Sequence, residues 1–143
     1  MVHALEEVRR VLVPGGVLID LRPLADRWRV EVVSAGGMQE TGRVDDLPEQ
    51  IHGDIAANQA MKEAEGRGWF RREAGELFPF FYSWDMPSEM EEFIEEDWGG
   101  FIELGDETKM KTRSAWALAN ADSRVRIRVN ILISRWRKLQ PLP

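Results

Sequence analysis

The sequence has no cysteine, only two histidines and no long apolar run. The absence of cysteine excludes disulfide bridges and thiolate metal sites, and we predict a cytoplasmic protein. His3 and His52 are not accompanied by carboxylates in metal-ligand spacing, so we expect structural or exposed histidines and no metal site. No apolar run approaches the roughly 20 residues that span a bilayer, so we predict no membrane partner.

Positive charge is also scarce. The 143 residues include 19 Lys and Arg against 25 Asp and Glu, a formal net charge of −6. Nucleic acid is a poor default partner for such a chain, and we predict none. A content of 43% hydrophobic and 31% charged residues is typical of a globular protein. The length fits a single domain over residues 1–143.

The common catalytic motifs are missing as well. Ser34, Ser83 and Ser88 lie in no GxSxG motif. The acidic residues between Glu89 and Asp97 lack the spacing of a calcium loop, and a charged helix face in water is the simpler interpretation. We therefore predict no catalytic residue.

The most informative feature that is present is the N-terminal segment. Leu5, Val8 and Leu12 recur at the spacing of one helix face. Pro14 disfavours helix at the residue before it, and the two glycines that follow permit a turn. The apolar run Val17–Ile19 then predicts a strand buried on both faces.

This segment resembles a helix–turn–strand unit found just past the midpoint of class I S-adenosylmethionine-dependent methyltransferases. The resemblance is specific over residues 3–21, weaker over 78–98 and topological beyond, while 24–76 is interpreted as an insertion. The residues that carry it are Leu5, Glu6, Val8, Arg10, Val11, Leu12, Val13, Pro14, Gly15, Gly16, Val17, Leu18, Ile19 and Asp20.

The resemblance implies the C-terminal half of a methyltransferase. In that family the glycine-rich turn and the acidic residue that bind the cofactor come before this unit, and neither has a counterpart here. We therefore assign no cofactor-binding residue. S-adenosylmethionine is expected only if a missing N-terminal half is supplied by another chain.

Local signals predict the elements in the middle of the chain. Alternating residues on both sides of Ala35–Gly37 predict a β-hairpin over 28–44. Asp46 is a candidate N-cap for a helix that runs to about Glu65. Residues 76–85 are β-prone, and Pro79 indicates an edge strand or a bulge.

The last third of the chain is predicted in the same way. Ser88–Glu91 has the pattern of a capping box and predicts a helix start. Residues 101–104 fit a short strand, and 108–120 is ambiguous between helix and strand, with helix favoured. Arg124–Trp136 alternates apolar and polar residues and is the clearest strand.

Arg124, Arg126 and Arg128 share one face of that last strand. Guanidinium groups spaced about 7 Å apart along a strand can contact a phosphate or carboxylate ligand. Cross-strand pairing with acidic residues is the favoured alternative, because acidic residues are in surplus.

An aromatic band over residues 69–84 is the second candidate for ligand contact. It can line an apolar pocket, and core packing is the favoured alternative. Its members are Trp69, Phe70, Phe78, Phe80, Phe81, Tyr82 and Trp84.

We predict an α+β fold, with a mainly antiparallel twisted sheet and helices largely on one face, as in the C-terminal half of a class I methyltransferase. The resemblance implies that the strand at 17–21 loses a neighbour and becomes an exposed sheet edge. A second copy in a C₂ homodimer, a separate chain carrying the missing half, or the hairpin at 28–44 can cover this edge.

Three functions follow as hypotheses. The first is a methyltransferase-related domain without catalysis of its own that acts as a binding or assembly module. The second is one half of a split S-adenosylmethionine-dependent methyltransferase that another chain completes. The third is a small-ligand binder that uses the aromatic band and Arg124, Arg126 and Arg128.

Overall fold

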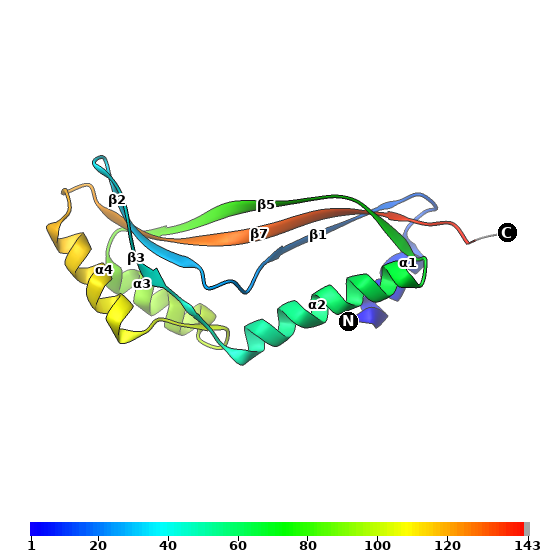
Figure 1. The fold of residues 1–143 in the computed structure, drawn as a ribbon, viewed down its shortest axis with the longest axis horizontal. Coiled ribbons are helices and arrows are strands. Elements are labelled where there is room, and N and C mark those ends of the chain that lie inside the picture. Colours follow the sequence, from blue (N-terminus) through cyan, green and yellow to red (C-terminus); the bar gives the residue numbers. More distant parts are fainter. Residues whose placement is uncertain (142–143) are drawn as a thin grey trace. The chain divides into compact units, whose positions relative to one another are not determined.

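The computed structural model describes residues 1–141 and has an α+β fold with an antiparallel sheet, as predicted (Figure 1). The chain divides into two compact units. Of the described residues, unit 1 contains Met1–Leu24, His52–Phe78 and 131–141. Unit 2 contains Ala25–Ile51 and Pro79–Asn130.

The main sheet has five strands. Their bounds are β1 Val17–Pro23, β2 Arg29–Ser34, β3 Gly37–Arg43, β5 Phe70–Trp84 and β7 Arg124–Lys138. The order is β1-β7-β2-β3, and β5 also pairs with β7. Two further strands, β4 Asp45–Asp46 and β6 Ile102–Glu103, form a separate pair. The strands predicted at the hairpin, at 101–104 and at 124–136 are thereby confirmed.

Strand β7 has partners in both units. Its C-terminal part pairs antiparallel with β1, from Pro23 opposite Ile131 to Val17 opposite Arg137. Its N-terminal part pairs antiparallel with β2, with Arg29 opposite Arg128. The hairpin strand β2 therefore covers part of β7.

The N-terminal helix–turn–strand unit forms as its local signals predict, with α1 over Val2–Val11. Gly15 has a φ of 73°, a conformation that favours glycine. A side chain on Gly16 would meet the carbonyl oxygen of Val13 at 2.8 Å. Lys138 closes the unit, because its Nζ donates to the Leu12 carbonyl at 2.6 Å and caps the end of α1.

The prediction that β1 is buried on both faces is wrong. Its residues alternate, and Val17, Ile19 and Leu21 are 36%, 50% and 59% exposed. Leu18 points the other way and packs against the core of unit 1. The reason is that α1 and α2 cover one face of this strand.

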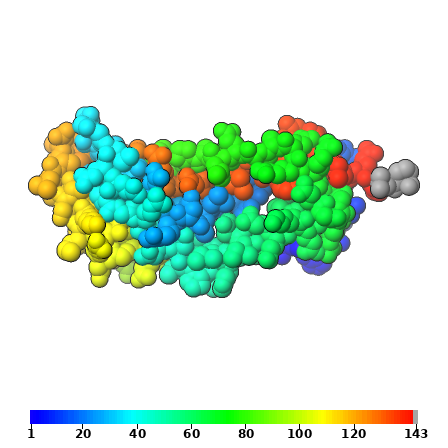
Figure 2. Space-filling model, viewed as in Figure 1, coloured from blue at the N-terminus to red at the C-terminus, as the bar shows by residue number. Residues whose placement is uncertain are grey.

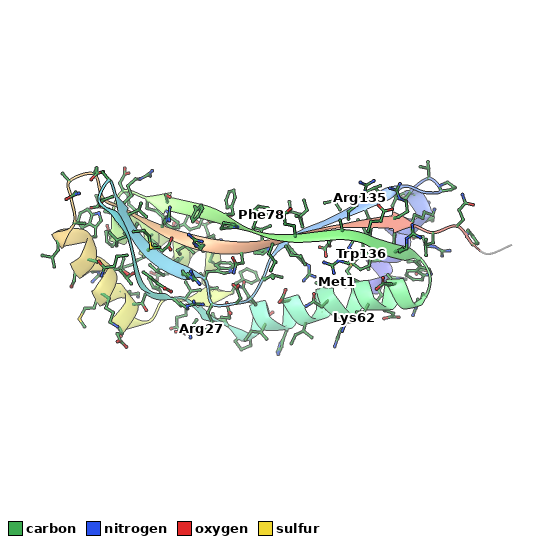
Figure 3. The ribbon with its side chains drawn as sticks, turned by 45° about the horizontal axis from the view of Figure 1, so that its top comes forward. Met1, Arg27, Lys62, Phe78, Arg135 and Trp136 are labelled. Carbon is green, nitrogen blue, oxygen red and sulfur yellow. The ribbon has the colours of Figure 1, made fainter. Side chains whose placement is uncertain are left out.

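Unit 1 packs its helices on that covered face. Helix α2 spans Pro48–Gly66, close to the predicted range, and runs along the sheet in Figure 1. The core contains Met61, Ala64, Trp69, Phe70 and Trp136, with apolar residues of α1 around them. Figure 3 shows Trp136 and Arg135 on opposite sides of β7, as neighbours on a strand must be.

A polar contact fixes α2 to β1. Arg22 of β1 donates to Asp54 at 3.0 Å and to Asn58 at 2.6 Å, both on α2. The same guanidinium contacts Asp20 at 3.2 Å on its own strand. Arg22 is therefore satisfied by three groups although its side chain is only 16% exposed.

Unit 2 has its own core between the sheet and helices α3, Pro87–Phe93, and α4, Asp106–Leu118. The π-helical turn η1, Ile94–Trp98, follows α3 directly. The helix favoured at 108–120 is thus confirmed. The buried apolar residues are Trp28, Val30, Val32, Val44, Met90, Ile94, Ile102, Leu104, Val125, Ile127 and Val129.

The capping box predicted at Ser88–Glu91 does not form. Helix α3 begins one residue earlier, with Met86 at the N-cap and Pro87 as the first helical residue. Proline suits this position because its fixed φ is already helical and it lacks an N–H. The acidic contact at this end comes instead from Glu89, which accepts the N–H of Asp85 at 3.2 Å.

Strand β5 is longer than the predicted 76–85 and pairs with β7. Among residues 1–141 no second strand flanks it, so the edge position that Pro79 indicates is confirmed. Most of its residues are exposed, and Figure 2 shows β5 at the surface. No helix within the described residues has the length and apolar content to cross a bilayer.

Candidate functional site

The three arginines singled out on β7 are all paired with acids of unit 2. Arg126 lies opposite Glu31, and its Nε donates to Glu31 Oε1 at 2.7 Å. Arg128 Nε lies 3.6 Å from Glu31 Oε2. Arg124 Nε lies 3.1 Å from Asp85, where both side chains are well exposed. Cross-strand pairing is therefore the arrangement of this face.

Glu31 is the centre of this arrangement, because its side chain is fully buried while those of Arg126 and Arg128 are 22% and 30% exposed. Phe81 of β5 covers both guanidinium groups, at 4.3 Å from Arg126 and 5.1 Å from Arg128. A cation over an aromatic ring is attracted by the ring quadrupole. The face is thus held by a buried carboxylate and an aromatic ring.

The aromatic band does not gather in one place. Trp69 and Phe70 lie in the core of unit 1. In unit 2, Tyr82 makes edge contacts with Phe80 at 5.2 Å and with Trp98 at 4.8 Å between ring centroids. Trp84, Phe93 and Trp28 join this ring cluster, while Phe81 lies with the arginines.

Unit 1 presents an apolar surface that we call the β1 surface, formed by Val17, Ile19, Leu21, Leu77, Ile131 and Ile133. The register places Leu21 opposite Ile133 and Pro23 opposite Ile131, so these residues share one face. Leu77 of β5 is 59% exposed and lies four residues after Glu73, which contacts the same face of β7. Contiguous exposed apolar residues mark interaction sites more often than isolated ones do.

Charged residues border the β1 surface at one end. Arg135 and Arg137 lie opposite Ile19 and Val17, and both bind Glu73, at 3.0 Å and 2.7 Å from Nε. The hydrogen bond from Arg137, aided by the charges of both arginines, lowers the pKa of Glu73, although desolvation opposes the shift. The hydrogen bond to Glu73 also raises the pKa of Arg137.

The two histidines lie outside these regions. His3 is on α1, exposed, and its Nδ1 is 3.3 Å from Glu6 Oε2. His52 is exposed on α2. Within residues 1–141 no cluster of three or more His, Asp or Glu is arranged to hold a metal ion.

Two features here were missed from the sequence. Glu31 sits in an alternating segment and carries no signal of burial, since its burial depends on strand pairing with β7 and on Phe81 from β5. Leu77, Ile131 and Ile133 join β1 only through the register of three strands. Comparison of the chain with protein-family models, curated proteins and solved structures finds no match.

Proposed function

We propose that the chain is a non-catalytic assembly module, related to the C-terminal half of class I methyltransferases, that forms a homodimer through β1. The observation that carries the proposal is the position of β1. It ends the order of the sheet, and its alternate residues Val17, Ile19 and Leu21 are exposed apolar side chains. An exposed, apolar edge strand favours association with another strand.

A second copy suits this edge for three reasons. The hairpin at 28–44 pairs with β7 rather than with β1, so it does not pair with the edge of β1. An antiparallel β1–β1 contact is self-complementary, as a C₂ interface requires. Centred on Leu21, such a contact places Asp20 of one copy opposite Arg22 of the other, so opposite charges meet.

Cysteine cross-linking tests the proposal on a clean background, because the chain has no cysteine. We expect Leu21→Cys to give a disulfide-linked dimer under mild oxidation, since a contact centred on Leu21 places this residue opposite itself and facing residues of antiparallel strands lie within disulfide reach. Ile19→Cys faces Pro23 of the other copy in this register and should cross-link more slowly. Leu118→Cys on α4, 88% exposed, is the matched control. Cross-linking of the control at the same rate as Leu21→Cys would contradict the proposal.

The split methyltransferase uses the same edge for a different partner, a chain that carries the glycine-rich turn. Calorimetric titration of the isolated chain with S-adenosylmethionine or S-adenosylhomocysteine distinguishes independent cofactor binding from the module proposed here. We expect no heat of binding from the chain alone. Clear saturable binding would overturn the non-catalytic assignment and leave the cross-linking result unaffected.

A further inference from the structure

A row of three arginines crosses three neighbouring strands in unit 2. Arg43 of β3 lies directly opposite Arg29 of β2, and Arg29 lies directly opposite Arg128 of β7. Directly opposite residues put their side chains on the same face, and like charges in such positions repel. This row runs across the sheet, whereas Arg124, Arg126 and Arg128 run along one strand.

The acids near this row do not balance it evenly. Arg43 Nε is 3.3 Å from Glu40, and both side chains are 41% exposed. Arg128 shares Glu31 with Arg126, and the Nε of Arg128 is buried without a hydrogen-bond partner. Within residues 1–141, Arg29 has no ion pair to an acid. The row therefore keeps unused positive charge and donor capacity in a chain whose net charge is −6.

The row borders a small polar cavity. Its volume is about 120 Å³, and Arg27, Arg29, Arg43 and Arg128 line it together with Asn130 and Asp26. Arg27, labelled in Figure 3, is held by Asp45 and Asp46, and Asp26 accepts a hydrogen bond from Asn130. The volume is a few times the ~30 Å³ share of one water molecule and far below the ~300 Å³ of a small drug-sized site.

We infer that this cavity binds a small phosphate-type oxyanion, either free phosphate or the terminal group of a phosphomonoester. A dianion between Arg29, Arg43 and Arg128 relieves their mutual repulsion, and guanidinium groups match its oxygens in paired hydrogen bonds. Phe81, 5.1 Å from the Arg128 guanidinium, and Glu31, 3.6 Å from its Nε, hold Arg128 in place. The site is independent of β1 and of the assembly proposed above.

The test compares thermal unfolding and calorimetric binding in sodium phosphate with those in sodium chloride of equal ionic strength. Phosphate should raise the unfolding temperature of the wild-type chain more than chloride does. Arg29→Gln should bind phosphate about tenfold or more weakly, because a charge-assisted contact is lost. Without phosphate the same variant should unfold at a higher temperature than wild type, since the repulsion in the row is gone.

Arg124→Gln is the matched control, because Arg124 lies on the same face of β7 outside the cavity and pairs with Asp85. It should keep phosphate binding within about twofold of wild type. Glycerol phosphate added in place of phosphate shows whether the esterified group also fits. Equal responses of the wild-type chain to phosphate and chloride, or full phosphate binding by Arg29→Gln, would overturn the inference.

Discussion

The two units expose sheet faces of opposite character. Unit 2 exposes arginines that a buried Glu31 and Phe81 hold in place. Unit 1 exposes the apolar β1 surface, with Arg135, Arg137 and Glu73 at its border. Arg124, Arg126 and Arg128 are each paired with an acid of their own unit, whereas the exposed apolar residues of β1 have no such cover among the described residues. In the proposed assembly, unit 1 is therefore the unit in which a partner would add stability.

Strand β7 also differs between the two units, because it buries a different face in each. In unit 2 it buries Val125, Ile127 and Val129, and in unit 1 it buries Ser134 and Trp136. The register shows how the partner strands β1 and β2 follow this change of face. From the pair Pro23–Ile131 to the pair Arg29–Arg128, the chain that carries β1 and β2 advances by six residues. Over the same interval β7 moves by only three residues. An odd offset exchanges the faces of the partner strand.

Truncation of matched isoleucines on β7 gives the largest expected effect. Ile127 is fully buried, and Ile127→Ala should lower the free energy of unfolding by about 2–5 kcal/mol through lost burial and a cavity. Ile133→Ala on the β1 surface should cost about half of that or less, because Ile133 is only partly buried. Urea unfolding of the dilute chain measures both losses, and equal losses would contradict the difference in burial between the two positions.

Removal of Arg126 tests how the charged face is held. Arg126→Met leaves the buried Glu31 with Arg128 alone, and we expect a loss of about 2–3 kcal/mol in the free energy of unfolding. The double variant Glu31→Met/Arg126→Met should recover part of this loss, since it removes the uncompensated buried carboxylate. Chemical denaturation of the four chains of this cycle gives the coupling. Simple additivity would contradict the role of Glu31.

A substitution in the turn after α1 tests the N-terminal helix–turn–strand segment. Gly16→Ala places a Cβ 2.8 Å from the Val13 carbonyl oxygen, so the backbone must move, at an expected cost of about 1–3 kcal/mol. The control Gly53→Ala on α2 meets no atom within 4 Å and should stabilise the chain slightly. Thermal unfolding of both variants gives the sign. A neutral Gly16→Ala would show that the turn tolerates a side chain.

Local signals were sufficient for most of the fold. The spacing of Leu5, Val8 and Leu12 predicts α1, and the glycines after Ala35 predict the β2–β3 turn, and both are confirmed. The first half of β5 was missed because Arg71–Glu76 is charged and shows no apolar alternation, and only its pairing with β7 makes it a strand. The early start of α3 at Pro87 was missed because the capping-box pattern outweighed the proline.

The candidate sites were harder to predict from the sequence. Arg124, Arg126 and Arg128 follow from alternation on one strand, and the sequence also offered their pairing with acids. The row of Arg43, Arg29 and Arg128 depends on the registers of two strand pairs, including a shift between Val30 and Glu31. A one-residue change in either register would send these side chains to the other face. Sequence periodicity alone does not fix register.

The smallest expected effect is a pH dependence at the border of the β1 surface. The folded-state pKa of Glu73 is lowered, so its stabilising contribution is present above the unfolded-state pKa and is lost as the pH falls through the folded-state pKa. Wild type should therefore unfold at a higher temperature than Glu73→Gln near neutral pH, and the difference should vanish in acid. A difference that is independent of pH would contradict the ion pairs of Glu73.

The most direct test of self-association through β1 is light scattering on a size-exclusion column. Wild type should elute with twice the 16.5 kDa of one chain. The double variant Ile19→Lys/Leu21→Lys should elute at the mass of one chain, and Leu118→Lys, on exposed α4, should stay dimeric. A wild-type chain that remains monomeric at every concentration, or a β1 double variant that remains dimeric, would contradict the proposed assembly.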